Sequence, residues 1–559
     1  MSFKKEAIKY LENYADILEF QGENRFKINA FRGAANTIRR LDAELEEMLH
    51  DGSITNVKGI GKGIQSFLFE LLDNGSVKEY EEHLGSIPEG ILDILQIRGL
   101  GVKKVKLLYE ELNIKNIDEL ENACKNNRLV TIKGFTEKTE EKIQEEIRNI
   151  RKHSKYALLN RAEHVGASIV EQLKTLNSVE RIEISGEIRR GLEIISKISI
   201  VIAVNDIDQF KKELITYYKH STITANTSKN TLLLEGDFPI PTELYLCNEE
   251  NFVKVLFETT GSQEFLSSLV KDKLSGAYKT ELDIFKDINF NFVIPEMREK
   301  EYFDAPKKLR INSDLEISNI KGLLHFHTDF SDGQNTLFEM VEEAKSMGFE
   351  YLAVSDHSKS AFYANGLNEE RVLKQKEVIK SVADGSGVQI FHGIESDILK
   401  DGSLDYSDDF MQNFDFVVAS VHSQFNLSEE EMTKRIIKAI ENPHTDVLGH
   451  PTGRLLLSRQ PYRVNIKKII DACAMNYVAI EINASPHRLD LDWRNYYYAR
   501  EIGCKFSINP DAHSTAGIHD VEYGIKIARK GGIQMNEVIN YLSLNDFKKY
   551  LNRKITKNL

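Results

Sequence analysis

The strongest constraint on the fold lies in the C-terminal part of the 559-residue chain, from about residue 321 onward. Seven short apolar runs are separated there by helix-length segments, a pattern typical of a parallel α/β sheet or barrel. Each run leads into histidine or carboxylate side chains. In chain order these are His325 and His327, Asp356 and His357, Glu395 and Asp397, His422, His450, Glu481, and Asp511 and His513.

These side chains are expected to converge, because the carboxyl ends of parallel strands meet at one face of a barrel. The region holds ten of the fifteen histidines of the chain. Imidazole and carboxylate groups together suit zinc, manganese or iron. One histidine at a strand end is usually structural, but seven strand ends of this kind predict a multinuclear metal centre.

The same region resembles the PHP (polymerase and histidinol phosphatase) family of phosphoesterases. The matching segments are HFHTDFSDG, SDHS, GIESDIL, SVHS, GHPTGR, IEINASPHRLDLDWR and NPDAHS. The resemblance implies a distorted (β/α)7 barrel in which nine ligands hold three divalent ions of manganese, zinc or iron. The implied ligands are His325, His327, Asp332, His357, Glu395, His422, His450, Asp511 and His513.

The resemblance also implies how the ligands are shared and which groups act on the substrate. One metal would take His325, His327, Glu395 and Asp511, a second would take Glu395 with His422 and His450, and a third would take Asp332, His357 and His513. The first four of these residues are expected to be catalytic through metal-assisted attack on phosphorus. Arg454, and also Arg488, could clamp a substrate phosphate, or both could be ordinary salt-bridge arginines.

Residues 1 to about 150 are predicted to be helical, because apolar residues recur three and four positions apart. One pattern repeats there: an apolar residue, Gly, any residue, Gly, then a helix. The copies contain Gly59, Gly61, Lys62 and Gly63; Gly99, Gly101, Lys103 and Lys104; and Gly134, with Thr136 in place of the second glycine. The free amides of the following helix suit a phosphate. The pattern resembles the helix-hairpin-helix motif of DNA-binding proteins, and an ordinary glycine-ended helix pair is the alternative.

Residues 156–300 have mixed α+β character, with strand-like runs at 182–184, 198–204 and 231–234, and the polar stretch 301–320 is expected to be a linker. Helix-hairpin-helix repeats, an α+β segment and a PHP domain, in this order, resemble the bacterial and archaeal family X DNA polymerases. The resemblance spans the whole chain. It implies a helical DNA-binding domain (1–90), a helical fingers-like domain (91–155), a nucleotidyltransferase-like palm and thumb (156–300), a linker (301–320) and a PHP domain (321–559).

The polymerase signature of that family is roughly GSxRRGxETxGDxD, and this chain reads GEIRRGLEIISKIS. Lys197 and Ser199 stand where two metal-binding aspartates are expected, and the third carboxylate is Glu243. Because an ammonium group cannot ligate Mg²⁺, the core is expected to keep its fold but not its metal site. The residues that still match the family are Arg189, Arg190, Gly261 and Ser262, and the nearby carboxylates that could compensate are Glu187 and Glu193.

The bulk composition limits how and where the chain acts. Its net charge of −13 means that DNA must be bound by local basic patches or backbone amides. The sequence shows no apolar run of membrane-spanning length, no signal peptide and no CxxC pair among its four cysteines. We therefore expect a cytoplasmic protein that does not enter a membrane, with a monomer favoured.

The family resemblance, together with these observations, implies a metal-dependent 3′→5′ exonuclease or phosphodiesterase of DNA repair, acting on gapped, nicked or 3′-ended DNA. Cleavage at abasic sites stays open. The alternatives are a working gap-filling polymerase, a small-molecule phosphatase of the histidinol-phosphate type, and a non-catalytic DNA-binding scaffold. The helix-hairpin-helix repeats argue against the phosphatase, and the complete ligand set argues against the scaffold.

Overall fold

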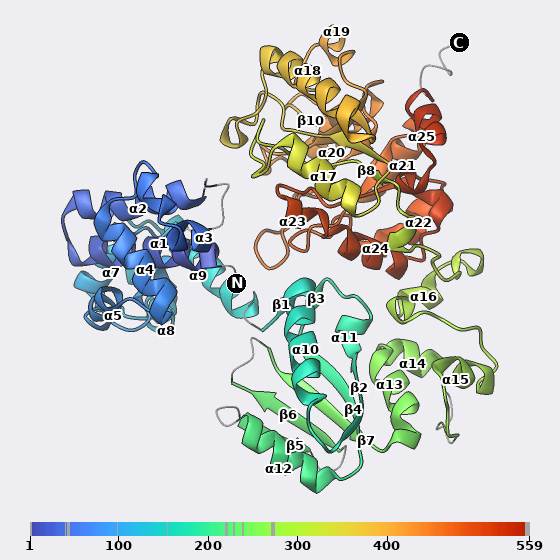
Figure 1. Cartoon of the computed structure of the whole chain (residues 1–559), viewed down its shortest axis with the longest axis horizontal. Coiled ribbons are helices and arrows are strands. Elements are labelled where there is room, and N and C mark those ends of the chain that lie inside the picture. Colours follow the sequence, from blue (N-terminus) through green and yellow to red (C-terminus); the bar gives the residue numbers. More distant parts are fainter. Residues whose placement is uncertain are drawn as a thin grey trace. The chain divides into compact units, whose positions relative to one another are not determined.

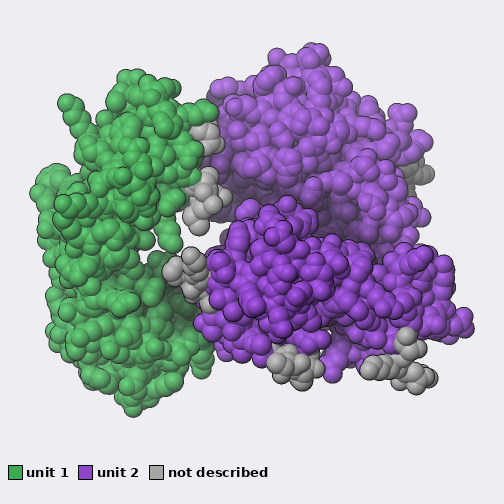
Figure 2. Space-filling view, turned by 60° about the horizontal axis from the view of Figure 1, so that its bottom comes forward, with its two compact units in different colours: residues 1–153 green, residues 154–559 purple. Residues whose placement is uncertain are grey.

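The computed structural model describes residues 3–39, 41, 45–97, 99–153, 155–218, 222–226, 230–236, 240–269, 274 and 276–553. The chain divides into two compact units, residues 1–153 and 154–559, which are coloured separately in Figure 2. No helix in the described part of the chain is both long and apolar enough to cross a membrane.

Unit 1 contains only helices among its described residues, as the apolar spacing predicts. They are α1 (Phe3–Gln21), α2 (Arg25–Arg39), α3 (Leu45–His50), α4 (Lys62–Asn74), α5 (Lys78–Gly85), α6 (Ile91–Leu95), α7 (Val102–Leu112), α8 (Ile117–Lys125) and α9 (Glu137–His153), with 3₁₀ turns η1 (Ser53–Asn56) and η2 (Leu129–Thr131). One apolar core runs through the unit and includes Leu11, Tyr14 and Phe67.

The first part of unit 2 is built on a five-stranded sheet in the order β2-β4-β7-β6-β5. Its elements are β1 (Ala157–Leu158), α10 (Leu159–Leu173), β2 (Val179–Ser185), α11 (Gly186–Arg189), β3 (Ile194–Ile195), β4 (Ile198–Val204), α12 (Ile207–Tyr217), β5 (Thr222–Asn226), β6 (Thr231–Glu235), β7 (Thr242–Cys247), η3 (Glu249–Asn251), α13 (Phe252–Thr260), α14 (Gln263–Leu269), α15 (Glu281–Asp287) and η4 (Pro295–Met297). The three predicted strand runs correspond to β2, β4 and β6.

The central strand β4 is buried along its whole length and has different neighbours on its two faces. Ile200 and Ile202 share a core with residues of α10 and α12, whereas Val201 and Ala203 pack with Phe252 of α13. Successive side chains of a strand point to opposite faces, so helices cover both sides of this sheet (Figure 1).

The stretch 301–320, expected to be a linker, carries α16 (Glu301–Asp304), η5 (Lys307–Leu309) and η6 (Ile317–Asn319). Tyr302, Leu315 and Ile320 are buried. The Ser313 hydroxyl donates to the carbonyl of Ile533 at 2.5 Å. This stretch is therefore packed against the C-terminal part of unit 2.

The rest of unit 2 is a seven-stranded parallel sheet in the order β14-β13-β12-β11-β10-β9-β8 (Figure 1). A parallel bridge between Phe326 and Ala512 brings its two edges together into a nearly closed barrel. The elements are β8 (Gly322–Leu323), α17 (Leu337–Ser346), β9 (Tyr351–Val354), η7 (Phe362–Ala364), α18 (Glu369–Ser386), β10 (Gln389–Asp397), α19 (Asp408–Met411), β11 (Phe416–Ser420), α20 (Glu429–Glu441), β12 (Val447–Leu448), α21 (Ile466–Asn476), β13 (Ala479–Asn483), η8 (Trp493–Asn495), α22 (Tyr496–Glu501), β14 (Phe506–Asn509), α23 (Thr515–Ile518), α24 (Val521–Lys530), η9 (Met535–Glu537), η10 (Ile539–Tyr541) and α25 (Leu544–Leu551).

Candidate metal centre

The carboxylate of Glu395, near the end of β10, lies at the middle of the histidine cluster. Its Oε1 is 3.0 Å from Nε2 of His450 and 3.3 Å from Nε2 of His422, and its Oε2 is 3.0 Å from Nδ1 of His357. Nε2 of His325 also lies 3.5 Å from Oε1 of Glu395. Four barrel strands therefore direct imidazoles at one buried carboxylate.

The predicted ligands fall into groups whose donor atoms lie within 4.8 Å of one another. The groups are His327, Asp332, His357 and His513; His325, His327 and Asp511; and His357, Glu395 and His422. His450 adjoins the last group, with its Nε2 3.3 Å from that of His422. All nine residues therefore lie close together, and their division among three metals stays a prediction.

The donor set fits divalent cations. Within the described residues, the buried Nδ1 atoms of His327 and His450 have no hydrogen-bond partner. Burial and the neighbouring His513 and His357 lower the pKa of His327 to about 3, which leaves a neutral imidazole able to bind a metal. Burial opposes the charge on His422, but Glu395 and Asp397 raise its pKa to about 10. The carboxylates that favour a proton on His422 would also favour a metal ion at this position.

Two further carboxylates orient ligand imidazoles from behind. Oε1 of Glu481, on β13, lies 2.7 Å from Nδ1 of His325, and both side chains are fully buried. Oδ1 of Asp397, at the end of β10, lies 2.6 Å from Nδ1 of His422. Such contacts determine which ring nitrogen faces a metal. Both acids stand at predicted strand ends, but sequence reasoning assigned neither of them this role.

The two candidate phosphate clamps occupy different environments. Arg454 is held within the protein: its Nε donates to the carbonyl of Arg488 at 2.9 Å, Nη1 to Asp492 at 3.1 Å, and Nη2 to the carbonyl of Leu489. Arg488 faces the centre, with its Nε 3.5 Å from Oδ2 of Asp511. Its buried Nη1 has no hydrogen-bond partner within the described residues. These contacts tie Arg454 to the loop that carries Arg488, and a phosphate-clamping role for either arginine stays a prediction.

The site that corresponds to the polymerase metal site, formed by Lys197, Ser199 and Glu243, contains the side-chain ammonium group of Lys197. Parallel pairing of β4 and β7 places Glu243 opposite Ser199, as the sequence predicts for a neighbouring strand. Nζ of Lys197 lies 2.6 Å from Oε2 of Glu243, which also accepts a hydrogen bond from the Tyr245 hydroxyl. Burial disfavours the charge on Lys197, but Glu243 and Tyr245 raise its pKa, so it stays protonated.

Comparisons with known proteins agree with this arrangement. Models of a helix-hairpin-helix domain, a SAM-like helix-hairpin-helix tandem and a PHP domain match residues 3–77, 91–149 and 324–485. The DNA polymerase/3′-5′ exonuclease PolX of Bacillus subtilis (strain 168) is 32% identical, with 98% of this chain and 99% of that protein covered. The chain belongs to the family X DNA polymerases with a C-terminal PHP domain.

Shorter relatives of this family X polymerase are named probable phosphatases. One from Thermoanaerobacter sp. (strain X514) is 30% identical over 42% of this chain and 95% of its own length. Another, from Acetivibrio thermocellus, is 28% identical over 41% of this chain and 94% of its own length. Both cover well under half of the family X chain.

The carboxylates that could have compensated for Lys197 and Ser199 in this family X chain are engaged elsewhere. Glu187 accepts hydrogen bonds from the amide of Ser196 at 2.6 Å and from its hydroxyl at 2.8 Å. Glu193 accepts from the Trp493 indole at 3.2 Å and from Arg494 at 2.9 Å, at the barrel. Neither carboxylate joins the Lys197–Glu243 pair in these contacts.

The residues that match the family signature are also held internally. Arg189 is paired with Glu281 at 2.7 Å, and Arg190 with Glu299 at 2.8 Å. The Ser262 hydroxyl accepts from the amide of Phe265 at 3.2 Å, and its own amide donates to the carbonyl of Arg298 at 3.0 Å; Gly261 ends α13. These contacts support the palm-like fold, and a role of the arginines in holding a triphosphate stays a prediction.

The helix-hairpin-helix turns of unit 1 have the backbone that the glycines predict. Gly59, Gly99 and Gly134 have φ angles of +100°, +91° and +98°, a region that favours glycine. Gly61 and Gly101 precede α4 and α7 without a side-chain cap, so first-turn amides stay available for phosphate. In the third copy Thr136 precedes α9, and its hydroxyl accepts from the amide of Thr139 at 3.2 Å.

The lysines next to these turns differ in their contacts. Lys62 and Lys103, like Gly63, are exposed, whereas Nζ of Lys104 donates to the carbonyl of Gly99 at 3.2 Å. Lys62 and Lys103 are therefore the better candidates for phosphate contacts. Arg98, between the second copy's apolar residue and Gly99, lies outside the described residues.

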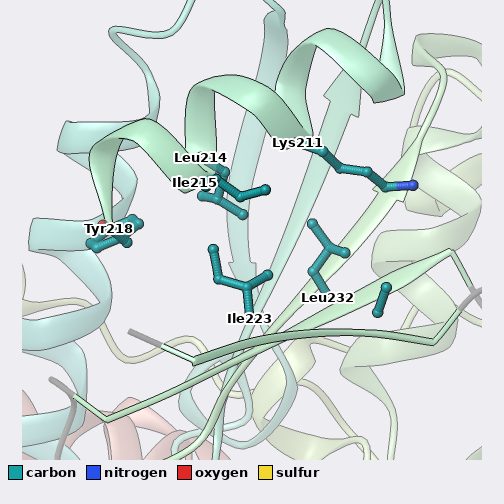
Figure 3. Close-up of a pocket in the computed structure, with 7 residues that line it drawn as sticks. Lys211, Leu214, Ile215, Tyr218, Ile223 and Leu232 are labelled. Atoms are coloured by element: carbon teal, nitrogen blue, oxygen red, sulfur yellow. The ribbon is translucent and has the colours of Figure 1, made fainter. Parts of the chain in front are cut away.

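A separate pocket of about 350 Å³ lies between α12 and strands β5 and β6 (Figure 3). Leu214 and Ile215 of α12 face Ile223 and Leu232 across it, and Lys211 is the charged residue of its lining. No histidine or carboxylate contributes to the described lining, so the pocket is not a second candidate for phosphoryl chemistry.

Proposed function

We propose that this family X chain acts mainly as a metal-dependent 3′→5′ exonuclease on gapped, nicked or 3′-ended DNA, and that its polymerase core does not synthesise DNA. The observation that carries the proposal is the contrast between two sites. Nine ligand-type side chains converge around Glu395, whereas the palm-like site holds Lys197 on its remaining carboxylate.

The proposed ligands are the nine residues predicted from the sequence. Bound metals would supply an activated water and neutralise charge on the phosphate. Glu481 and Asp397 would hold His325 and His422 in the ligating orientation. Arg488 would bind a phosphate oxygen with its unpaired Nη1. Asp332 and His513 are the more exposed ligands, with about a third of each side chain accessible, so DNA would enter from their side.

DNA rather than a small phosphate ester is the proposed substrate because of unit 1. Two helix-hairpin-helix family models cover most of it, and its glycine turns present uncapped helix amides. Such turns bind backbone phosphates with little dependence on base sequence. A small-molecule phosphatase of the histidinol-phosphate type would have no use for them.

The nuclease is tested by replacing His327 or Glu395 with alanine. Cleavage of labelled gapped and 3′-ended DNA with Mn²⁺, Mg²⁺ or Zn²⁺ should fall more than about 100-fold. Losing only a hydrogen-bond partner of a ligating histidine already lowers metal affinity or activity about 10–100-fold. Metal content should fall together with cleavage, while DNA binding measured by fluorescence anisotropy persists.

His519→Ala, which removes an exposed histidine paired with Glu343, is the matched control. Undiminished cleavage by the first two variants would exclude this site, and hydrolysis of histidinol phosphate but not DNA would favour the phosphatase.

The loss of synthesis is tested by primer extension on a gapped duplex in the Glu395→Ala background, so that degradation cannot hide extension. We expect no template-directed extension, because one carboxylate neutralised by Lys197 cannot recruit two Mg²⁺ ions. Extension at the rate of a repair polymerase would contradict this. If no extension is seen, adding Lys197→Asp and Ser199→Asp shows whether the missing ligands alone prevent synthesis.

A further inference from the structure

The loop between β9 and α18 displays two neighbouring aromatic side chains beside the candidate metal centre. Phe362 and Tyr363, on η7, are 89% and 71% exposed. The Tyr363 ring centroid lies 6.1 Å from the ring of His357 and 6.5 Å from that of His422. Single exposed apolar residues need no explanation, but an adjacent pair at the edge of a reaction centre indicates a contact surface.

The exposure of these rings does not come from a loose loop. Ala361, Ala364 and Leu367 are buried beneath it. The amide of Leu367 donates to the carbonyl of His357 at 2.8 Å, and Nη1 of Arg371 donates to the carbonyl of Asn365 at 2.7 Å. The aromatic pair is therefore already held in place, and a ligand would lose little affinity to ordering it.

The charge of the loop suits a polyanion. Residues 358–368 contain no Asp or Glu, although the chain has 86 acidic residues and a net charge of −13. The one charged residue among them is Lys359, which is paired with Glu369 at 2.7 Å. The loop therefore contributes no carboxylate of its own to the path of an approaching nucleic-acid strand.

We propose that Phe362 and Tyr363 form a stacking platform for the bases of the DNA strand that is cleaved. The inference rests on the proposed nuclease function and names how its substrate is held. Every base has a π-face, so stacking tolerates any sequence. A base stacked on Tyr363 would keep its phosphate beside His357 and His422. Because a paired base must leave its partner to stack, the platform favours an unpaired 3′ end.

The platform is tested first by binding, with single-stranded DNA that carries 2-aminopurine at its 3′ end. The full-length Glu395→Ala variant is used so that the DNA is not cleaved. Stacking of the 2-aminopurine base on Tyr363 should quench the fluorescence of that base. Tyr363→Ala should abolish most of the quenching, and Tyr363→Phe, which keeps the ring, should retain it. Tyr477→Ala is the control, because it removes an exposed aromatic just before β13, at the opposite end of the strands. Equal quenching by Tyr363→Ala and the parent would overturn the proposal.

Cleavage provides the second readout. With Mn²⁺, Phe362→Ala and Tyr363→Ala should each raise KM for a normal 3′ end about tenfold, since base–aromatic stacking contributes ~1–3 kcal/mol. An end that carries abasic nucleotides has no base to stack, so its KM should not change. An equal rise in KM for both substrates would assign these residues a merely structural role. If the unsubstituted protein cleaves no DNA, the nuclease proposal fails, and the 2-aminopurine quenching still decides the platform.

Discussion

At the scale of single residues, two carboxylates outside the nine predicted ligands, Glu481 and Asp397, contact the imidazoles of predicted ligands. Glu481 contacts Nδ1 of His325 and accepts hydrogen bonds from the amides of His450 and Asn509 at 2.6 and 2.9 Å. For Asn509 the donor is the side chain, and for His450 it is the backbone. One buried anion thus orients two predicted ligands from different strands.

Replacing Glu481 with glutamine keeps the side-chain shape but removes its charge. Metal affinity and DNA cleavage should each fall about 10–100-fold, because outer partners of ligating histidines contribute effects of that size. Metal titration followed by mass spectrometry, with circular dichroism to check folding, measures the change. Glu343→Gln alters a glutamate that pairs with the exposed His519 at 2.9 Å and should have no effect. Equal metal affinity in the two variants would contradict the assigned role of Glu481.

At the scale of secondary-structure elements, three segments of the palm-like region are joined by one carboxylate. Glu281, the first residue of α15, pairs with Arg189 of α11 and with Arg298, which follows η4 and is fully buried. Burial opposes its ionisation, but the two arginines lower the pKa of Glu281 to about 2. Arg189, which matches the polymerase signature, therefore stabilises the fold of this region.

Glu281→Gln should destabilise unit 2 by about 3 kcal/mol at neutral pH, because it leaves the buried Arg298 without its anion. The folded-state pKa lies below the usual value near 4.5, so the ionic contribution is complete above about pH 5 and is lost as pH falls toward 2. Urea unfolding followed through Trp493, the one tryptophan of the chain, reports on this unit. The difference between parent and variant should therefore shrink in acid, and a constant difference from pH 7 to pH 3 would rule out the ionic origin.

At the scale of the whole molecule, the barrel and the palm-like region share buried charges. Lys530 of α24 is fully buried, with its Nζ 2.8 Å from Glu299 and 3.1 Å from the carbonyl of Arg190. Glu193 contacts Trp493 and Arg494 in the same junction. Separating the barrel near residue 316 would uncover these groups, whereas a cut at residue 154 follows the boundary between the two compact units.

A shortened chain of residues 154–559 should therefore keep its hydrolysis of a small phosphodiester within about twofold and lose most of its affinity for long DNA. The full chain should bind DNA more weakly as salt rises, since phosphate contacts release counterions. Fluorescence anisotropy at several salt concentrations measures both effects. The same affinity with and without unit 1 would show that the helix-hairpin-helix turns do not bind DNA.

Patterns local in the chain were enough to predict much of this architecture. A strand and the side chains that follow it are neighbours in sequence, so His325, Glu395 and Asp511 could be recognised as a set before their convergence was seen. The helix-hairpin-helix turns follow from glycines two residues apart. The replacement of an aspartate by Lys197 is likewise visible in the sequence.

Contacts between distant segments could not be predicted in this way. Arg454 and Arg488 look equivalent in sequence, yet one supports a loop and the other faces the centre. Glu193 contacts Arg494, 301 positions away, and His325 contacts Glu481, 156 positions away. Hydrogen bonding and desolvation of a charged side chain depend on the groups that folding brings around it, and residue spacing carries no record of them.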